Sequence, residues 1–351
     1  MAILNLNDEE SVKKYNEFVR NREHTSAMQD LNWGKVKAEW KKEAIYIEKN
    51  GNIIATMLIL IRRVAKGFTM MYAPRGPVCD IYDTKMVEEL MKDVDTLAKK
   101  YKAFVFKMDP EVKYDEKLEG LYKAKGYFVN GRNVSDKKLI QPRYNMILNI
   151  ENRSIDEIFS GYSEKTRYNI RVAKKKGVTV RYSRDEEDLK KFYELSLVTA
   201  KRDNISMRPY EYFKTMLDAY DENFLRIYVA EAEGKVLSAA LALKYSTKLF
   251  YIYGASSNEL RNYMPNYLMQ QEMITWGKEE GCTEYDFGGV YELNKSNGLY
   301  KFKEGFCRQE GVTEFIGEIG KKYNKAKYFI FTNLLPLARR IIVKIGKLKN
   351  R

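Results

Sequence analysis

Histidine is almost absent from this sequence of 351 residues, and His24 is the single copy. A metal site with two histidine ligands therefore cannot be built from this chain. A serine or cysteine nucleophile activated by histidine would depend on His24 alone, and its polar N-terminal surroundings predict a surface histidine instead. We predict no metal site and a reaction that requires no histidine.

Cysteine, proline and long apolar runs are also scarce. Cys79, Cys282 and Cys307 are scattered and odd in number, which is typical of reduced thiols in a cytoplasm. We expect Cys282 and Cys307 to be packed thiols rather than nucleophiles. The polar start of the chain has no signal-peptide core, and no run of about 18 apolar residues occurs that would span a bilayer. We therefore expect a cytoplasmic protein.

Positive charge is abundant but unevenly placed. The formal net charge is +14, from 62 Lys and Arg against 48 Asp and Glu. Ten of the cations and no acid lie between Lys321 and Arg351, which leaves only +4 for residues 1–320. The body of the protein is thus nearly balanced, and the basicity belongs to a C-terminal tail.

The most informative feature that is present is a pattern that occurs twice, about 180 residues apart. Each copy has two strands around a glycine turn, a third strand, an amphipathic helix and a further strand. The first copy lies at 44–48, 53–62, 68–73, 84–101 and 104–106, and the second at 225–230, 236–243, 249–253, 265–281 and 285–287. A repeat of this length predicts two duplicated domains with a cleft between them.

We place the domain change at the segment Gln141-Pro142-Arg143-Tyr144. The predicted domains are residues 1–144 and residues 145–317, followed by a basic amphipathic C-terminal extension over residues 318–351. Further helices are expected at 8–20, 31–40, 163–176, 185–202 and 209–219.

The order of these elements resembles the GNAT acyltransferase fold. This implies an α/β (α+β) protein with two tandem GNAT-like domains, whose mixed sheets are flanked by helices. GNAT acetyltransferases bind the CoA pyrophosphate on a glycine-rich turn at a helix N-terminus. The corresponding turns here, 76–80 and 261–267, contain one glycine and none. This disfavours a CoA-dependent N-acetyltransferase, which remains one alternative.

Several motifs are more specific, and together they resemble the Fem family of bacterial aminoacyltransferases, which build peptidoglycan interpeptide bridges. They are Asp30-Leu31 with Trp33 and Lys35-Val36-Lys37, Met108-Asp109-Pro110-Glu111-Val112, Gln141-Pro142-Arg143, Ser163 to Arg171, Arg208-Pro209 with Glu211-Tyr212-Phe213, Tyr285-Asp286-Phe287-Gly288-Gly289 and Leu299-Tyr300-Lys301-Phe302-Lys303. The FemX type resembles this chain most closely, because no room exists between Asn145 and Ile319 for the helical-hairpin arm of FemA-like members.

The resemblance implies a reaction without a cofactor. An amino acid is moved from aminoacyl-tRNA to the side-chain amine at position three of the muropeptide stem. The acceptor is UDP-MurNAc-pentapeptide or its lipid-linked form, lipid II. We expect a monomer.

The resemblance also implies which residues bind and react. Lys37 and Arg208 match residues that bind the diphosphate of the muropeptide, with Lys35 beside them. Trp40 and Phe104 match nucleotide-side positions, and Tyr212 and Tyr253 match further substrate contacts. Phe302 and Lys303 match the place where the aminoacyl end of tRNA arrives.

Aminolysis of an ester passes through an oxyanion, which a fixed ammonium such as that of Lys303 stabilises. We expect Lys303 on a strand, where it would share a face with Lys301. Asp109 is either a base for the attacking amine or a turn-stabilising residue before Pro110. The ester is already activated, so no protein nucleophile is needed.

Two basic segments have open interpretations. Lys165, Arg167, Arg171 and Lys174 on the helix 163–176 suit a tRNA backbone or a solvated face. The tail beyond Pro336 suits an interfacial helix on anionic lipid at the inner face of the membrane, or a helix docked on the first domain. A nonenzymatic RNA-binding module with a degenerate GNAT fold is the other alternative function.

Overall fold

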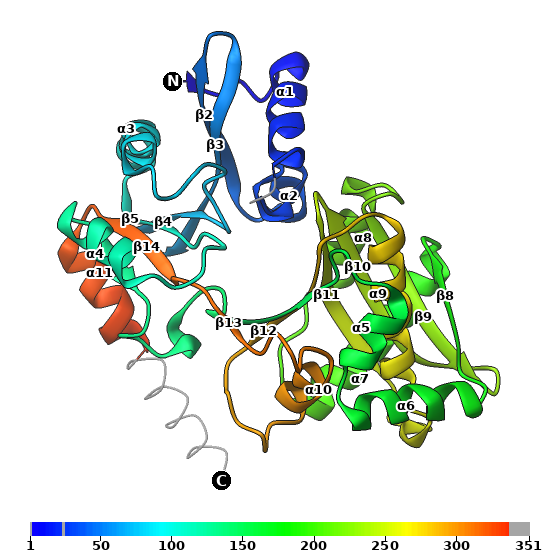
Figure 1. Cartoon of the computed structure of the whole chain (residues 1–351). Coiled ribbons are helices and arrows are strands. Elements are labelled where there is room, and N and C mark those ends of the chain that lie inside the picture. Colours follow the sequence, from blue (N-terminus) through cyan, green and yellow to red (C-terminus); the bar gives the residue numbers. More distant parts are fainter. Residues whose placement is uncertain (1, 23–24, 337–351) are drawn as a thin grey trace.

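The computed structural model describes residues 2–22 and 25–336. Two seven-stranded mixed sheets, each flanked by helices, lie side by side (Figure 1). Among these residues, no helix combines the length and the apolar character needed to cross a membrane. His24 and the tail positions from Leu337 onward lie outside the described residues.

The first sheet has the strand order β1-β2-β3-β4-β5-β14-β6. The elements of this half are β1 (Ala2–Ile3), α1 (Glu9–Arg20), η1 (Ala27–Gln29), α2 (Leu31–Val36), β2 (Lys41–Lys49), β3 (Asn52–Ala65), β4 (Phe68–Ala73), α3 (Thr84–Tyr101), β5 (Ala103–Met108), α4 (Glu116–Ala124), β6 (Phe128–Asn130) and η2 (Asp136–Lys138). Asn50 and Gly51 both have positive φ, 54° and 79°, and form a tight turn between β2 and β3.

The second sheet has the order β13-β7-β12-β11-β10-β9-β8. The elements from here to the C-terminus are β7 (Tyr144–Asn149), α5 (Ile155–Gly161), α6 (Glu164–Lys175), β8 (Thr179–Ser183), α7 (Glu186–Asp203), α8 (Tyr210–Ala219), β9 (Leu225–Ala232), β10 (Lys235–Tyr245), β11 (Lys248–Ser256), η3 (Arg261–Tyr263), α9 (Pro265–Glu279), β12 (Glu284–Val290), α10 (Gly298–Phe306), β13 (Thr313–Glu314), β14 (Glu318–Lys322), α11 (Lys325–Phe329) and η4 (Ile330–Leu334). Helix α7 packs on β9, β10 and β11, so it does not project as an arm.

The two halves repeat one topology. In the first, β2-β3 and β3-β4 are antiparallel, α3 follows, and β4-β5 is parallel. In the second, β9-β10 and β10-β11 are antiparallel, α9 follows, and β11-β12 is parallel. The repeat predicted from the sequence is therefore present in the fold.

One strand crosses between the halves. Strand β7, which opens the second half, pairs with β12 in its own sheet. Strand β14, which follows the second copy, pairs with β5 and β6 in the first sheet. The segment expected to begin a basic extension at residue 318 thus begins with a sheet strand. Lys321 in this strand pairs with Asp95 at 2.8 Å.

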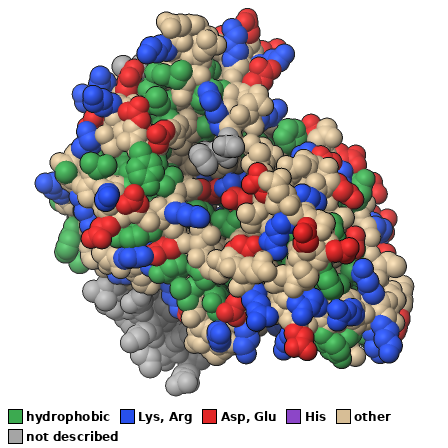
Figure 2. All heavy atoms as spheres, in the orientation of Figure 1, with side chains coloured by type: hydrophobic (Ala, Val, Ile, Leu, Met, Phe, Trp, Pro, Cys, Tyr) green, Lys and Arg blue, Asp and Glu red, His purple; other side chains and the backbone are tan. Residues whose placement is uncertain are grey.

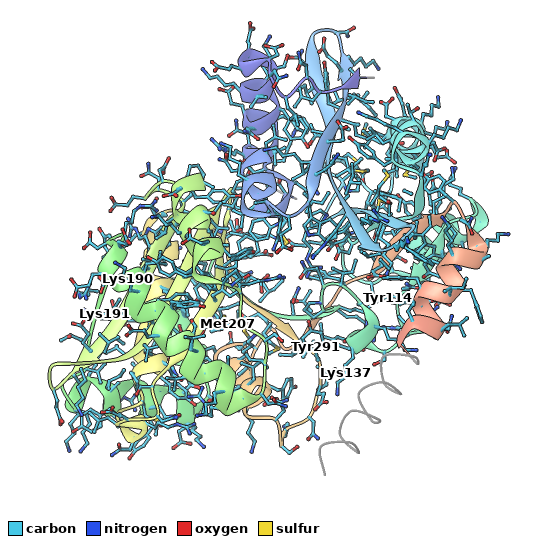
Figure 3. The ribbon with its side chains drawn as sticks, turned by 180° about the vertical axis from the view of Figure 1, so that it is seen from behind. Tyr114, Lys137, Lys190, Lys191, Met207 and Tyr291 are labelled. Carbon is cyan, nitrogen blue, oxygen red and sulfur yellow. The ribbon has the colours of Figure 1, made fainter. Side chains whose placement is uncertain are left out.

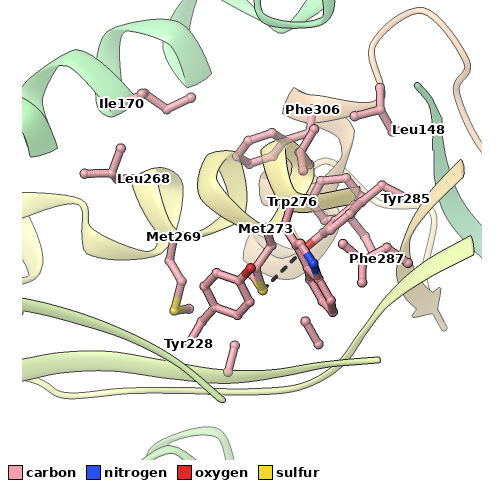
Figure 4. Packing of buried hydrophobic residues seen from close by; sticks show 14 of the residues in the cluster. Leu148, Ile170, Tyr228, Leu268, Met269, Met273, Trp276, Tyr285, Phe287 and Phe306 are labelled. Atoms are coloured by element: carbon pink, nitrogen blue, oxygen red, sulfur yellow. Dashed lines mark hydrogen bonds between the residues drawn. The ribbon is translucent and has the colours of Figure 1, made fainter. Parts of the chain in front are cut away.

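Hydrophobic packing joins the halves as well. In the second half, α9 lies between the sheet and α6, and the Tyr285 hydroxyl donates to the sulfur of Met273 on α9 at 3.8 Å (Figure 4). Another core contains residues of both halves, including Tyr15 and Trp33 from the first and Phe213 from the second. This shared core fixes the surfaces that meet at the junction.

Candidate active site

The parallel strands β11 and β12 separate part-way along the second sheet. Lys248–Phe250 pair with Glu284–Asp286, and in the described chain no later positions of the two strands are paired with one another. The equivalent strands of the first sheet stay paired from Thr69 to Ala73 of β4. The second sheet therefore has a gap between two neighbouring strands where the first sheet has none.

Lys303 reaches this opening from α10. The strand that we expected here is wrong, because Gly298–Phe306 form a helix whose first turn is capped by the side chain of Asn297. Positions two apart point in different directions on a helix, so Lys301 and Lys303 do not share a face. Lys303 is 5% exposed, and its Nζ donates to the Gly289 carbonyl of β12 at 3.0 Å.

Lys303 and Asp286 are opposite charges in a buried environment. Burial lowers the pKa of Lys303 to about 8, and the Asp286 carboxylate partly opposes this shift. Burial, and secondarily the nearby Glu111 carboxylate, raise the pKa of Asp286 to about 6. Near pH 7 both side chains are mostly charged, so the ammonium is present to meet a developing negative charge.

A cavity of about 520 Å³ lies beside α10 and the start of α9. Its lining residues are Leu237, Ser256, Ser257, Glu259, Arg261, Asn262, Met264, Pro265, Asn266, Tyr267, Gly298 and Phe302. The start of α9 is poorly suited to bind a diphosphate. The backbone of Met264 is in the left-handed conformation with φ 55°, and Pro265 has no N–H to donate.

Lys37 and Arg208 come together from the two halves. Lys37 follows α2, Arg208 precedes α8, and these helices pack on each other. Lys37 Nζ donates to the Tyr212 hydroxyl at 2.6 Å, and the Tyr253 hydroxyl donates to the same oxygen at 3.2 Å. Met207, beside Arg208, lies on the side of the second half that faces the junction (Figure 3).

The electrostatics of this cluster favour an anion. Burial, and secondarily the charge of Arg208, lower the pKa of Lys37 to about 7. Glu39, the acidic side chain that acts on Lys37, is itself paired with Arg62 at 3.0 Å. Two adjacent cations with hydroxyl groups beside them are the donors that a phosphate group requires.

The nucleotide-side positions lie further along the first half. Trp40 is partly buried and packs between the shared core and the cluster around Phe104. Phe104 itself is 1% exposed, with its ring 5.6 Å from that of Phe68 and 5.2 Å from that of Phe331. The C-terminal segment thus covers Phe104, which presents no free ring face to a nucleotide here. Lys35 is exposed on α2, outside the Lys37 cluster.

Asp109 is buried at the end of β5. Its Oδ1 accepts from the Arg75 backbone N–H, and its Oδ2 accepts from the Tyr72 hydroxyl, both at 2.7 Å. Arg75 has φ 54°, so this carboxylate holds a left-handed turn. Burial raises the pKa of Asp109 to about 6. These contacts support the turn-stabilising alternative, and the role as a base stays a prediction.

The basic helix α6 is amphipathic. Lys165, Arg171 and Lys174 are exposed, whereas Arg167 is half-buried and donates to the backbone carbonyls of Ser160 and Tyr162. Lysine and arginine side chains gather along the edge of the second half where α6 runs (Figure 2). Arg167 therefore stabilises the start of the helix, and the other three are accessible to a partner.

The sequence did not single out the ion pairs between the halves. Glu111 lies 3.4 Å from Arg75 Nε in its own half and 3.2 Å from Lys248 Nζ of β11. Glu111 and Asp286 stood in motifs of the family resemblance. Nothing in the local pattern of Arg75 or Lys248 distinguished them from surface cations, because their partners are distant in sequence.

Sequence comparison decides the family. The FemAB family matches over residues 11–235 and 226–335. The chain belongs to the FemAB family. A Weissella viridescens relative, UDP-N-acetylmuramoylpentapeptide-lysine N(6)-alanyltransferase, is 36% identical over 333 residues, which cover 93% of this chain and 98% of that protein. The Lipid II:glycine glycyltransferase of Staphylococcus aureus is 28% identical over 417 aligned positions, which cover 97% of this chain and 98% of that protein. This FemAB-family chain is an aminoacyltransferase.

Solved structures agree with this family assignment. The crystal structure of FemX superimposes with a TM-score of 0.84 at 26% identity, covering 95% of this chain and all of that one. A tandem GNAT protein from the clavulanic acid biosynthesis pathway has a TM-score of 0.54 at 12% identity, over 92% of this chain and 97% of that one. The second likeness concerns the fold alone. The predicted Fem resemblance and tandem GNAT-like fold are thus confirmed.

Proposed function

We propose that this FemAB-family chain transfers an amino acid from aminoacyl-tRNA to the side-chain amine at stem position three of a peptidoglycan precursor. The observation that carries the proposal is the buried Lys303 ammonium at the separation of β11 and β12, beside a cavity that Phe302 lines. An open pair of strands next to a fixed cation is a site where an acyl group can be bound and its oxyanion stabilised.

The acceptor side is the cluster of Lys37, Arg208, Tyr212 and Tyr253. Tyr212 accepts hydrogen bonds from both Lys37 and Tyr253, so its own O–H proton remains to be donated. Together with the two cations, this hydroxyl offers donors to a diphosphate. Both UDP-MurNAc-pentapeptide and lipid II contain that group, so the cluster suits either acceptor.

The donor side is the cavity with the basic helix behind it. Ser163, which precedes α6, donates its N–H to the Gly305 carbonyl of α10 at 2.8 Å. The accessible cations Lys165, Arg171 and Lys174 therefore belong to the same rigid unit as Phe302 and Lys303. We propose that they bind the tRNA backbone while the aminoacyl end enters the cavity.

The reaction needs no protein nucleophile. The neutral acceptor amine attacks the ester carbonyl, a C–N bond forms, and the carbonyl electrons move to oxygen. The Lys303 ammonium stabilises this oxyanion, an effect worth about 3 kcal/mol at comparable sites. The oxyanion collapses, the C–O bond to the terminal ribose breaks, and the proton lost by the amine ends on the ribose oxygen. Asp109 is the predicted base that accepts this proton from the amine.

We also propose peripheral contact with an anionic membrane. Phe329 and Leu334 are 58% and 47% exposed at the end of the described chain. Six Lys or Arg and no acid follow in residues 337–351. Exposed apolar side chains next to a basic segment are typical of a surface that binds anionic lipid.

Incubation of the monomeric protein with alanyl-, glycyl- or seryl-tRNA and each muropeptide acceptor tests the proposal. We expect one aminoacyl mass increment on the precursor. A nonenzymatic RNA-binding module would bind tRNA and leave the precursor unchanged. Incorporation of an acetyl group from acetyl-CoA instead would support the acetyltransferase alternative.

A further inference from the structure

Strand β12 contains an irregularity in register between Asp286 and Gly289, and this bulge lies against Lys303. Asp286 Oδ1 accepts from the Gly288 backbone N–H at 2.7 Å. One residue further on, the Gly289 carbonyl accepts from Lys303 Nζ at 3.0 Å. A carboxylate and an ammonium are therefore connected through a single turn of backbone.

Both glycines of the bulge are required by the geometry. Gly288 has φ 77°, a left-handed conformation that other residues adopt only with strain. At Gly289 a Cβ atom would lie 1.8 Å from Cγ of Pro142, in the segment that joins the halves. The carboxylate of Asp286 and the ring of Pro142 thus confine the bulge from two sides.

Asp286 is 5% exposed, and burying a carboxylate is unfavourable unless its contacts compensate. The charged groups that act on it are Glu111, Lys248 and Arg75 from the junction of the halves. Asp286 and Cys307 are the groups that act on Lys303. The Gly288 N–H, Lys248 and Arg75 compensate this buried carboxylate, and its charge in turn acts on Lys303.

We propose that Asp286 is a positioning residue for Lys303: its carboxylate fixes the Gly288–Gly289 bulge, whose carbonyl directs the Lys303 ammonium toward the acyl oxygen. This inference rests on the proposed function, in which Lys303 is the catalytic cation. An ammonium has three N–H groups, so the bond to Gly289 leaves donors for the oxyanion while limiting rotation of a long side chain. Misplacement of such a group by about 1 Å lowers rates by about 100-fold.

Three variants test this proposal in full-length protein with aminoacyl-tRNA and UDP-MurNAc-pentapeptide. Asp286→Ala removes the acceptor for Gly288, and we expect the single-turnover rate to fall about 100-fold with the muropeptide Kd within twofold of wild type. Asp286→Asn keeps an oxygen acceptor but loses the charge. We expect a smaller loss below pH 7 and an alkaline limb of the rate profile that moves to lower pH, because Lys303 then loses its proton more readily. The control is Asp188→Ala, a buried carboxylate bonded to Arg181 and Ser183 away from α10.

The proposal is overturned if Asp286→Ala and Asp286→Asn transfer at the wild-type rate with an unchanged pH profile. It is also overturned if Asp188→Ala lowers the rate as much as Asp286→Ala does, since the effect is then a general loss of stability. Lys303→Met is assayed in parallel to separate this inference from the proposed function. An active Lys303→Met contradicts the catalytic role itself, whereas an inactive one with wild-type rates in the Asp286 variants contradicts only the positioning role.

Discussion

Lys37 Nζ lies 2.6 Å from the hydroxyl oxygen of Tyr212, although 175 positions separate the two residues in the chain. The contact joins the end of α2 in the first half to α8 in the second. A diphosphate bound here would therefore contact both halves at once, which orients the acceptor relative to the opening in the second sheet.

Lys37→Ala and Arg208→Ala should each weaken muropeptide binding by about 2–5 kcal/mol, because each removes one cation from a diphosphate. This corresponds to a loss of roughly 30-fold or more, measurable by calorimetry with the nucleotide-linked precursor. The affinity for tRNA should stay near that of wild type. Lys14→Ala on the surface of α1 is the control. Muropeptide affinities within twofold of wild type would contradict the assignment of Lys37 and Arg208 to the acceptor site.

Muropeptide affinity should fall as pH rises above 7. Burial has lowered the pKa of Lys37 to about 7, so a growing fraction of Lys37 is neutral above pH 7. Lys37 must be protonated to form an ion pair with the diphosphate. We expect at most about a tenfold loss per pH unit between pH 7 and 9, and none in Lys37→Met. The sign for stability is opposite, because the unfolded chain holds the Lys37 proton more tightly and folding becomes more favourable as pH rises from 7 to 10. A flat affinity profile in wild type would contradict this role.

Removal of positive charge from α6 should weaken tRNA binding and leave muropeptide binding unchanged. Replacement of Lys165, Arg171 and Lys174 by Ala should weaken tRNA binding and reduce the salt dependence of log Kd by about one for each phosphate that the helix no longer neutralises. The control replaces Lys190 and Lys191 on α7, which are exposed and partly exposed and are paired with acidic residues of their own helix (Figure 3). An unchanged salt dependence would contradict this role and indicate that the cations of α6 only face solvent.

The strand position of Lys321 changes how the tail is tested. A deletion that begins there would remove the ion pair with Asp95 and part of β14, so the truncation belongs after Pro336. Loss of residues 337–351 should reduce sedimentation with anionic vesicles at low salt, since each cation near such a surface contributes about 1 kcal/mol. Activity on the nucleotide-linked precursor should persist. Failure of the full-length protein to sediment with the vesicles would instead support a helix docked on the first domain.

Much of the architecture could be predicted because the same order of strands and helix occurs twice, with Asn50-Gly51 marking one turn. The return of β14 to the first sheet could not, because Glu318–Lys322 is short and charged and its apolar partners belong to a distant segment. The same limit applies to Phe104, whose burial depends on Phe331. Around Lys303 the glycines at 298 and 305 disfavour a helix locally, and packing of α10 against α6 overrides that preference.

Among the residues of the site, those in local motifs could be found from the sequence, and those defined by tertiary pairing could not. Lys37 and Arg208 were expected near a diphosphate, and the structure brings them together. Lys248 and Arg75 are both paired with Glu111, which no spacing rule connects to them. Burial also decides the pKa of Asp286, and burial is a property of the folded chain.

The central claim is that Lys303 stabilises the oxyanion of acyl transfer from tRNA. Its most direct test is the single-turnover rate of Lys303→Met with aminoacyl-tRNA and saturating muropeptide, measured alongside the muropeptide Kd. The account predicts a rate lower by about 100-fold to 1,000-fold with Kd within twofold of wild type, because a charge needed in the transition state is removed. Transfer at the wild-type rate would contradict it.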